Sequence, residues 1–153
     1  MRILLLAQWY APIIGGEETH VRSLAHALVE RGHDVAVATL AHPDRPPLEM
    51  DGGVRIHRVG ATVQRLPSLF SSTGRQSVPP APDPEVARGL RRILKRDRPD
   101  VVHAHNWLAY SLLPVRQRST PFVMTLHDHS LACAKKNMLY GESACSEIGR
   151  AHV

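Results

Sequence analysis

Apolar residues along the chain fall into short continuous runs, separated by stretches with helical spacing. The runs Arg2–Ala7 and Val35–Leu40 are typical of strands buried on both faces of a parallel sheet. Between them, apolar residues recur at i, i+3, i+4 and i+7, as Val21, Leu24, Ala25 and Leu28. This spacing predicts an amphipathic helix, which Gly32 would end as a left-handed cap. Residues 2–40 therefore predict one βαβ unit with a right-handed crossover.

Three later segments, Val54–Val59, Val101–His105 and Phe122–Leu126, predict further strands. The segment His42–Gly53 is rich in Pro and Asp and predicts a loop. Thr62–Pro82 is rich in Ser, Pro and Gly without a clear period, which predicts a surface excursion. The alternation of strands with helices predicts an α/β fold with a doubly wound, Rossmann-like parallel sheet.

Local signals place two more helices. Asp83 followed by Pro84 is typical of a helix start, because the carboxylate accepts free backbone N–H groups and proline fits the first helical position. Pro99 would close this helix, and a short helical stretch is expected near Trp107–Leu113. No internal repeat or second domain is evident, so residues 1–146 are expected to form one domain.

Composition narrows the class of protein. Hydrophobic residues make up 43% of the chain and charged residues 22%, as in ordinary globular proteins. No apolar run approaches the roughly 20 residues of a membrane span, and the opening run is too short for a signal peptide. Cys133 and Cys145 are too few for a disulfide framework. These observations predict a cytoplasmic protein.

The net charge of +5, from 19 basic and 14 acidic residues, is concentrated between Arg88 and Arg118. A solvated helix face explains such a stretch most simply. Peripheral attraction to the anionic inner face of a membrane, or to an anionic acceptor, is the alternative. Nucleic acid is not expected as a partner, because no aromatic residues interleave with the charges to stack on bases.

Candidate chemistry gathers at strand ends. Gly15-Gly16 follows the first predicted strand, His105-Asn106 ends the fourth, and His127-Asp128 follows the fifth. If the fourth strand lies beside the first, all three face the crevice where open α/β sheets bind ligands. Two glycines before a helix suit a phosphate or a tight turn equally well. No acidic residue follows the second strand to bind a ribose, which disfavours an NAD-binding domain.

Histidines allow a second interpretation. His103 and His105 alternate along one strand and so share a face. Together with His127, Asp128 and His129 they could form a metal cluster. A buried His103 bonded within the core is the simpler account, so no metal is expected. His127 itself could take part in proton transfer or sugar binding, or bond to a backbone carbonyl.

Several motifs, in order, resemble glycosyltransferase family 4. They are Pro12-Ile13-Ile14-Gly15-Gly16, Thr19-His20-Val21, Leu24-Ala25, Leu28, Arg31-Gly32-His33-Asp34-Val35, the segment Arg98 to Asn106, and Thr125-Leu126-His127-Asp128. Each motif is degenerate, but together they are specific and cover the chain to about Cys145. The resemblance implies the N-terminal, acceptor-side half of a GT-B fold and a retaining transfer of sugar from a nucleotide diphosphate sugar.

Site roles follow from the same resemblance. His127 matches the catalytic histidine that contacts the donor sugar, and Gly15 and Gly16 would approach the donor phosphates and the acceptor. Asn106 and Asp128 would line the pocket of a carbohydrate or lipid-linked acceptor. No cofactor is implied beyond the nucleotide sugar itself. Cys133 and Cys145 resemble the start of a cysteine cluster that some members carry.

The end of the chain carries two expectations. Residues 147–153 are those encoded by the start of a common short-read sequencing adapter, which predicts a non-native tail after Ser146. The nucleotide-binding C-terminal domain of the family is not encoded here, so the chain alone is expected to be inactive. A non-catalytic Rossmann-like binding module and a metal-dependent hydrolase that uses the histidines are the competing classes.

Overall fold

A computed structural model describes residues 1–65, 77–127, 139–140 and 143–144. Its strands are β1 (Arg2–Leu6), β2 (Asp34–Leu40), β3 (Leu48–Asp51), β4 (Val54–Val59), β5 (Val101–His105), β6 (Phe122–Thr125), β7 (Leu139–Tyr140) and β8 (Ser143–Ala144). Its helices are α1 (Gly16–Glu30), the 3-10 helix η1 (Thr62–Arg65), α2 (Pro84–Asp97) and α3 (Leu108–Leu112). None of these helices is both long and apolar enough to span a bilayer.

Six strands form one sheet in the order β3-β4-β2-β1-β5-β6. β1 pairs in parallel with β2 on one side and with β5 on the other, and β6 adds to β5 in parallel. The chain thus winds outward from β1 in two directions, which confirms the doubly wound α/β fold. Strands β7 and β8 form a separate antiparallel pair.

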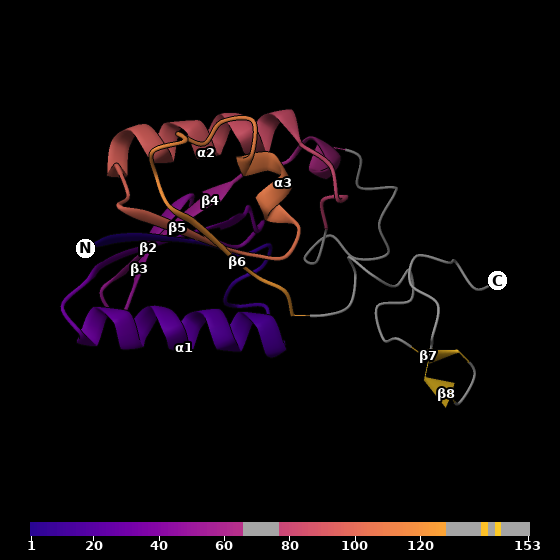
Figure 1. The fold of residues 1–153 in the computed structure, drawn as a ribbon, viewed down its shortest axis with the longest axis horizontal. Helices are drawn as coiled ribbons and strands as arrows, with labels where there is room; N and C mark the ends of the chain where they lie inside the picture. The colour runs from indigo at the N-terminus through magenta and orange to yellow at the C-terminus, as the bar shows by residue number, and fades with distance from the viewer. Residues whose placement is uncertain (66–76, 128–138, 141–142, 145–153) are drawn as a thin grey trace.

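The sheet lies between two helical layers, with α1 on one face and α2 and α3 on the other (Figure 1). Alternate residues of β1 supply the two cores. Leu4 and Leu6 pack on the side of α2 and α3, whereas Ile3 and Leu5 pack on the side of α1. Leu4, Leu5 and Leu6 are completely buried, which explains why the sequence shows a continuous apolar run here.

The predicted helix ends are confirmed. The carboxylate of Asp83 accepts hydrogen bonds from the backbone N–H groups of Glu85 at 2.9 Å and Val86 at 3.1 Å, with Pro84 in the first turn. Gly32 follows α1 with a φ of +79°, the left-handed conformation that glycine adopts most readily.

The Pro- and Asp-rich segment 42–53, predicted to be a loop, contains β3. This edge strand pairs antiparallel with β4. Its apolar residues Leu48 and Met50 are exposed, while Glu49 and Asp51 are half-buried. Charged contacts hold it, because Glu49 pairs with Arg58 of β4 and Asp51 accepts two hydrogen bonds from Arg22 of α1. A strand without a buried apolar face leaves no hydrophobic pattern in the sequence.

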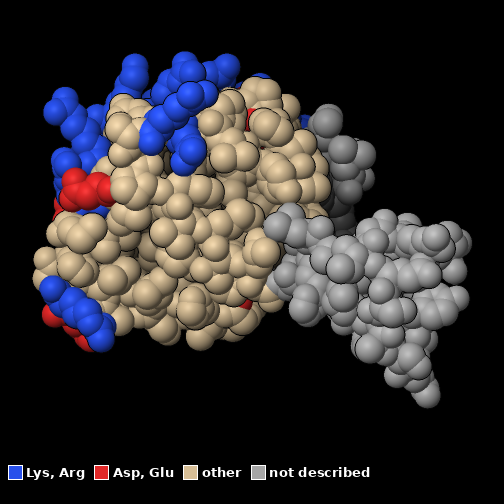
Figure 2. All heavy atoms as spheres, in the orientation of Figure 1, with Lys and Arg blue, Asp and Glu red and all other residues tan. Residues whose placement is uncertain are grey.

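The outward face of α2 is basic. Arg88, Arg91, Arg92, Lys95 and Arg96 are all exposed on it. Figure 2 shows the Lys and Arg side chains gathered along the edge of the molecule where α2 lies in Figure 1. Within the described part of the chain, only Arg96 of these five makes an ion pair, with Asp97. The solvated helix face predicted from the charge pattern is therefore present.

Gly89 lets α2 approach β4 closely, and a substitution at this position tests how tightly the two elements pack. A Cβ at this position would lie 2.7 Å from Cγ1 and 3.0 Å from Cβ of Val59. We expect Gly89→Ala to lower the free energy of unfolding by up to about 2 kcal/mol. Overpacking costs about 1–3 kcal/mol, and the better helix propensity of alanine offsets only about 1 kcal/mol of it. Urea unfolding followed by circular dichroism measures the change.

The control is the same substitution in a Val59→Ala background, which removes the obstructing methyl groups. There Gly89→Ala should cost clearly less than in the wild-type background, because of the Val59 atoms only Cβ, at 3.0 Å, remains close. Stabilisation in both backgrounds would show that α2 shifts freely and that the close approach is unimportant.

Candidate functional site

Three segments meet at the carboxyl edge of the sheet, as the strand-end pattern predicted. The glycine loop follows β1, Asn106 follows β5, and His127 lies two residues beyond β6. Because β1, β5 and β6 are neighbours in the sheet, these segments lie side by side. Strand order reverses between β1 and β5, and open α/β sheets bind ligands at such a switch point.

Gly15 and Gly16 stand at the N-terminus of α1. Gly15 is the N-cap residue with an extended backbone, and its carbonyl accepts the N–H of Thr19 at 3.0 Å. A Cβ on Gly16 would meet no described atom within 4 Å, so local packing does not demand glycine there. Glycine here keeps the N-terminus of a 15-residue helix without a bulky side chain, where backbone N–H groups commonly bind anions, and the first turn also carries Glu17 and Glu18.

Asn106 joins all three segments. Its backbone has a φ of +54°, which asparagine tolerates better than most residues, and its N–H donates to the carbonyl of Thr125. Its side-chain Oδ1 accepts the backbone N–H of His127 at 3.1 Å, and its Nδ2 donates to Glu17 at 2.6 Å. Both halves of the amide are thus engaged with protein, a contact that the sequence did not predict.

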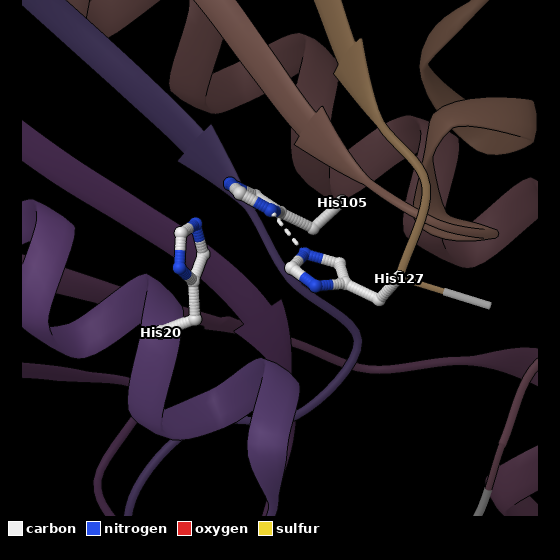
Figure 3. A group of neighbouring side chains, drawn as sticks. All are labelled: His20, His105 and His127. Atoms are coloured by element: carbon white, nitrogen blue, oxygen red, sulfur yellow. Dashed lines mark hydrogen bonds between the residues drawn. The ribbon is translucent and has the colours of Figure 1, made fainter.

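Imidazole rings form the centre of the site (Figure 3). Nδ1 of His105 and Nε2 of His127 lie 2.7 Å apart, within hydrogen-bond distance. His20 on α1 approaches both rings edge-on, with centroids 5.8 Å from His105 and 5.2 Å from His127. The sequence analysis named His20 only as part of a motif and did not place it in the site. Its place one helical turn after Gly16 was the available signal, since i and i+4 share a helix face.

His103 shares a face with His105, as predicted, and the two rings lie 4.3 Å apart. Nε2 of His103 lies 2.7 Å from the Thr125 hydroxyl of β6, so this histidine is bonded within the sheet. Burial lowers the pKa of His103, and so does charge on His20 and His127. Burial, followed by charge on the neighbouring histidines, lowers the pKa of His105 to about 3. His105 is therefore neutral at physiological pH.

The metal cluster considered from the sequence takes a different form. His20, His105 and His127 each offer a nitrogen within 4.8 Å of the others, and they are the described residues that could hold a metal ion. However, the 2.7 Å between the nitrogens of His105 and His127 is shorter than the roughly 3.3 Å between two nitrogens on one tetrahedral zinc. The geometry fits a hydrogen-bonded pair better than two ligands of one metal.

Four residues named by the sequence analysis lie outside the described residues. They are Asp128, His129, Cys133 and Cys145, and the predicted tail 147–153 with the preceding Ser146 lies outside the described residues too.

Comparisons with known proteins agree with this architecture. A family model described as a glycosyl transferase 4-like domain matches residues 15–150. Glycogen synthase from Mycobacterium tuberculosis is 34% identical over 140 residues, which cover 83% of this chain and 33% of that protein. A phosphatidylinositol N-acetylglucosaminyltransferase chain from Arabidopsis thaliana is 31% identical over 137 residues, which cover 86% of this chain and 28% of that protein.

Solved structures share the fold. Sucrose-phosphate synthase from Thermosynechococcus elongatus superposes with a TM-score of 0.60 at 18% identity, covering 82% of this chain and 33% of that one. The catalytic domain of starch synthase IV from Arabidopsis thaliana, bound to ADP and acarbose, superposes with a TM-score of 0.56 at 17% identity. That match covers 95% of this chain and 37% of the synthase chain.

The chain spans between a fifth and a third of the length of the curated relatives it matches. Across most of that span, the order of motifs in the sequence, the doubly wound sheet and the family match agree. The chain belongs to the glycosyl transferase 4-like domain family.

Proposed function

We propose that this domain is the acceptor-side half of a retaining glycosyltransferase, which moves a sugar from a nucleotide diphosphate sugar to an acceptor hydroxyl. One observation carries the proposal: the glycine N-terminus of α1, Asn106 and His127 converge on one sheet edge of a glycosyl transferase 4-like domain. The names of its relatives support both substrates. One relative is named for phosphatidylinositol, and a structural neighbour binds ADP and acarbose.

The sugar-transfer reaction requires groups that the carboxyl edge of the sheet would supply. The acceptor oxygen attacks the anomeric carbon, the sugar–phosphate bond breaks, and the acceptor proton leaves with the diphosphate. Negative charge grows on the diphosphate, which the N–H groups at Gly15 and Gly16 would stabilise from the helix end. His127 would donate a hydrogen bond to a donor-sugar oxygen in the transition state. Asn106 and Asp128 would border the acceptor, and no cofactor beyond the nucleotide sugar is needed.

Two other classes make different predictions. A non-catalytic binding module would bind a nucleotide sugar without turnover. A metal-dependent hydrolase would lose activity on chelation and would need no acceptor. The deciding assay uses the complete natural polypeptide that carries this domain, a panel of nucleotide sugars and candidate acceptors. Release of nucleotide diphosphate that depends on the acceptor and survives chelation supports glycosyl transfer.

A basic surface supports a further proposal, peripheral contact with an anionic membrane. Arg88, Arg91, Arg92 and Lys95 project from α2 over less than three helical turns. Beside them, a hollow of about 420 Å³ is lined by Arg65, Arg88 and Arg92, among others, and could receive a lipid phosphate group. Clustered basic residues gain about 1 kcal/mol each near an anionic bilayer surface.

For the active site, we predict that His127→Ala in the complete enzyme lowers turnover by about 30- to 1000-fold. One hydrogen bond made in the transition state is worth about 2–4 kcal/mol. The free energy of unfolding should fall by no more than about 1–3 kcal/mol, the cost of leaving Nδ1 of the buried His105 without its partner. Steady-state kinetics and urea unfolding of the same preparations measure both quantities.

The matched control for that variant is His33→Gln, in the turn between α1 and β2 at the other edge of the sheet. It should retain full turnover. A marked loss of stability with normal turnover in His127→Ala would assign this histidine to structure.

For the membrane contact, we predict that the full chain sediments with vesicles of phosphatidylcholine and phosphatidylglycerol but not with phosphatidylcholine alone. Arg91→Glu/Lys95→Glu should weaken this binding by about 30-fold or more, since two favourable charges become repulsive. Raised salt should weaken it as well. Arg31→Glu/Arg45→Glu carries the same change in net charge away from α2 and should bind more tightly than the α2 variant. Equal binding by the two variants would refute a specific role for this helix.

A further inference from the structure

Either His105 or His127 could donate the hydrogen bond between them, and the surroundings of His105 indicate which ring is the donor. His105 is the last residue of β5 and is completely buried. Its Nδ1 lies 2.7 Å from Nε2 of His127. Among the residues that the structure describes, no group hydrogen-bonds to its Nε2. One ring nitrogen of His105 is therefore paired and the other is not.

A neutral imidazole carries one N–H and one bare nitrogen, so two arrangements are available. If His127 donated from Nε2, His105 would carry its proton on Nε2, as a buried N–H without a partner. If His105 donates from Nδ1, its buried Nε2 is a bare acceptor. Unpaired buried N–H groups are rarer in proteins than under-satisfied acceptors. The second arrangement is thus favoured. Since burial lowers the pKa of His105, the doubly protonated ring does not intervene near neutral pH.

The consequence falls on His127. When its Nε2 accepts from His105, the single proton of a neutral His127 must sit on Nδ1. In Figure 3 this second nitrogen points away from His105. Free histidine prefers the opposite tautomer, with the proton on Nε2, so a neutral ring held as Nδ1–H requires a partner that imposes it.

We propose that His105 is a positioning residue that holds His127 in the Nδ1–H tautomer. The proposal rests on the role proposed above for His127 in transfer. Asn106 provides an independent restraint, because its Oδ1 accepts the backbone N–H of His127. The ring and the backbone of His127 are thus held by consecutive residues at the end of β5.

The direct test is long-range proton–nitrogen correlation spectroscopy of the ¹⁵N-labelled full chain at pH 7.5. We expect the Nδ1 resonance of His127 at the protonated position and its Nε2 resonance at the unprotonated position. The reverse pattern in the wild-type chain would overturn the proposal, and this measurement needs no substrate and no variant that might fail to fold.

Variants make the assignment specific. His105→Leu should return His127 to the Nε2–H tautomer. His105→Asn should preserve Nδ1–H, because the asparagine amide nitrogen lies close to the place of histidine Nδ1. Thr125→Val removes the partner of His103 without touching the His105–His127 bond and should change nothing at His127. An unchanged tautomer in His105→Leu would show that His105 does not impose it.

Metal binding is the remaining outcome. Zn²⁺ added to the chain should bind weakly or not at all at these rings. Tight binding of one Zn²⁺ per chain that is lost in His105→Leu would overturn the proposal and make the rings ligands instead.

In the complete enzyme, His105→Leu should lower kcat by about 10- to 100-fold with little change in KM, and His105→Asn should recover most of the loss. A tautomer that matches our expectation in an enzyme indifferent to His105→Leu would refute the positioning role alone. Loss of activity in His127→Ala would still support the proposed function.

Discussion

Parallel pairing of β1 with both β2 and β5 is the constraint on which the rest of the domain depends. It buries β1 on both faces, so that its alternate residues must supply two separate cores. It also sets the direction in which each neighbouring strand ends. Every strand beside β1 therefore delivers its following loop to the same edge of the sheet. The glycine loop, Asn106 and His127 meet there because of backbone pairing, independently of their side-chain contacts.

Elements with a buried apolar stripe could be predicted from the sequence, and their bounds agree within a residue or two. β1, β2 and β6 each show a nearly continuous apolar run, β4 and β5 mix apolar residues with arginine or histidine, and α2 shows a stripe and a cap. β3 could not be predicted, because backbone pairing and ion pairs with Arg58 and Arg22 hold it in place of apolar burial. Interactions between charges distant in sequence leave no local periodicity to read.

The candidate site could likewise be predicted only in part from the sequence. Strand ends are visible in a sequence, so Gly15, Gly16, Asn106 and His127 could be placed at one edge in advance. The partners of each side chain could not, because they depend on how α1 packs against the sheet. His20 joins His105 and His127 only in three dimensions, and the amide of Asn106 reaches Glu17 across 89 positions in the chain. Asp128 lies outside the described residues, so its role stays a prediction.

Gly89 also restricts how α2 can be rotated about its own axis. Successive residues of an α-helix are turned by about 100° around its axis, so only one side of α2 can face Val59 at this close distance. Turning the helix by one residue would place the side chain of Arg88 or Leu90 against Val59, where there is room only for the hydrogen of Gly89. The rotation of α2 about its axis is thus fixed by Gly89 together with its buried residues Val86, Leu90, Ile93 and Leu94. The five exposed cations of α2 therefore keep one direction relative to the carboxyl edge of the sheet.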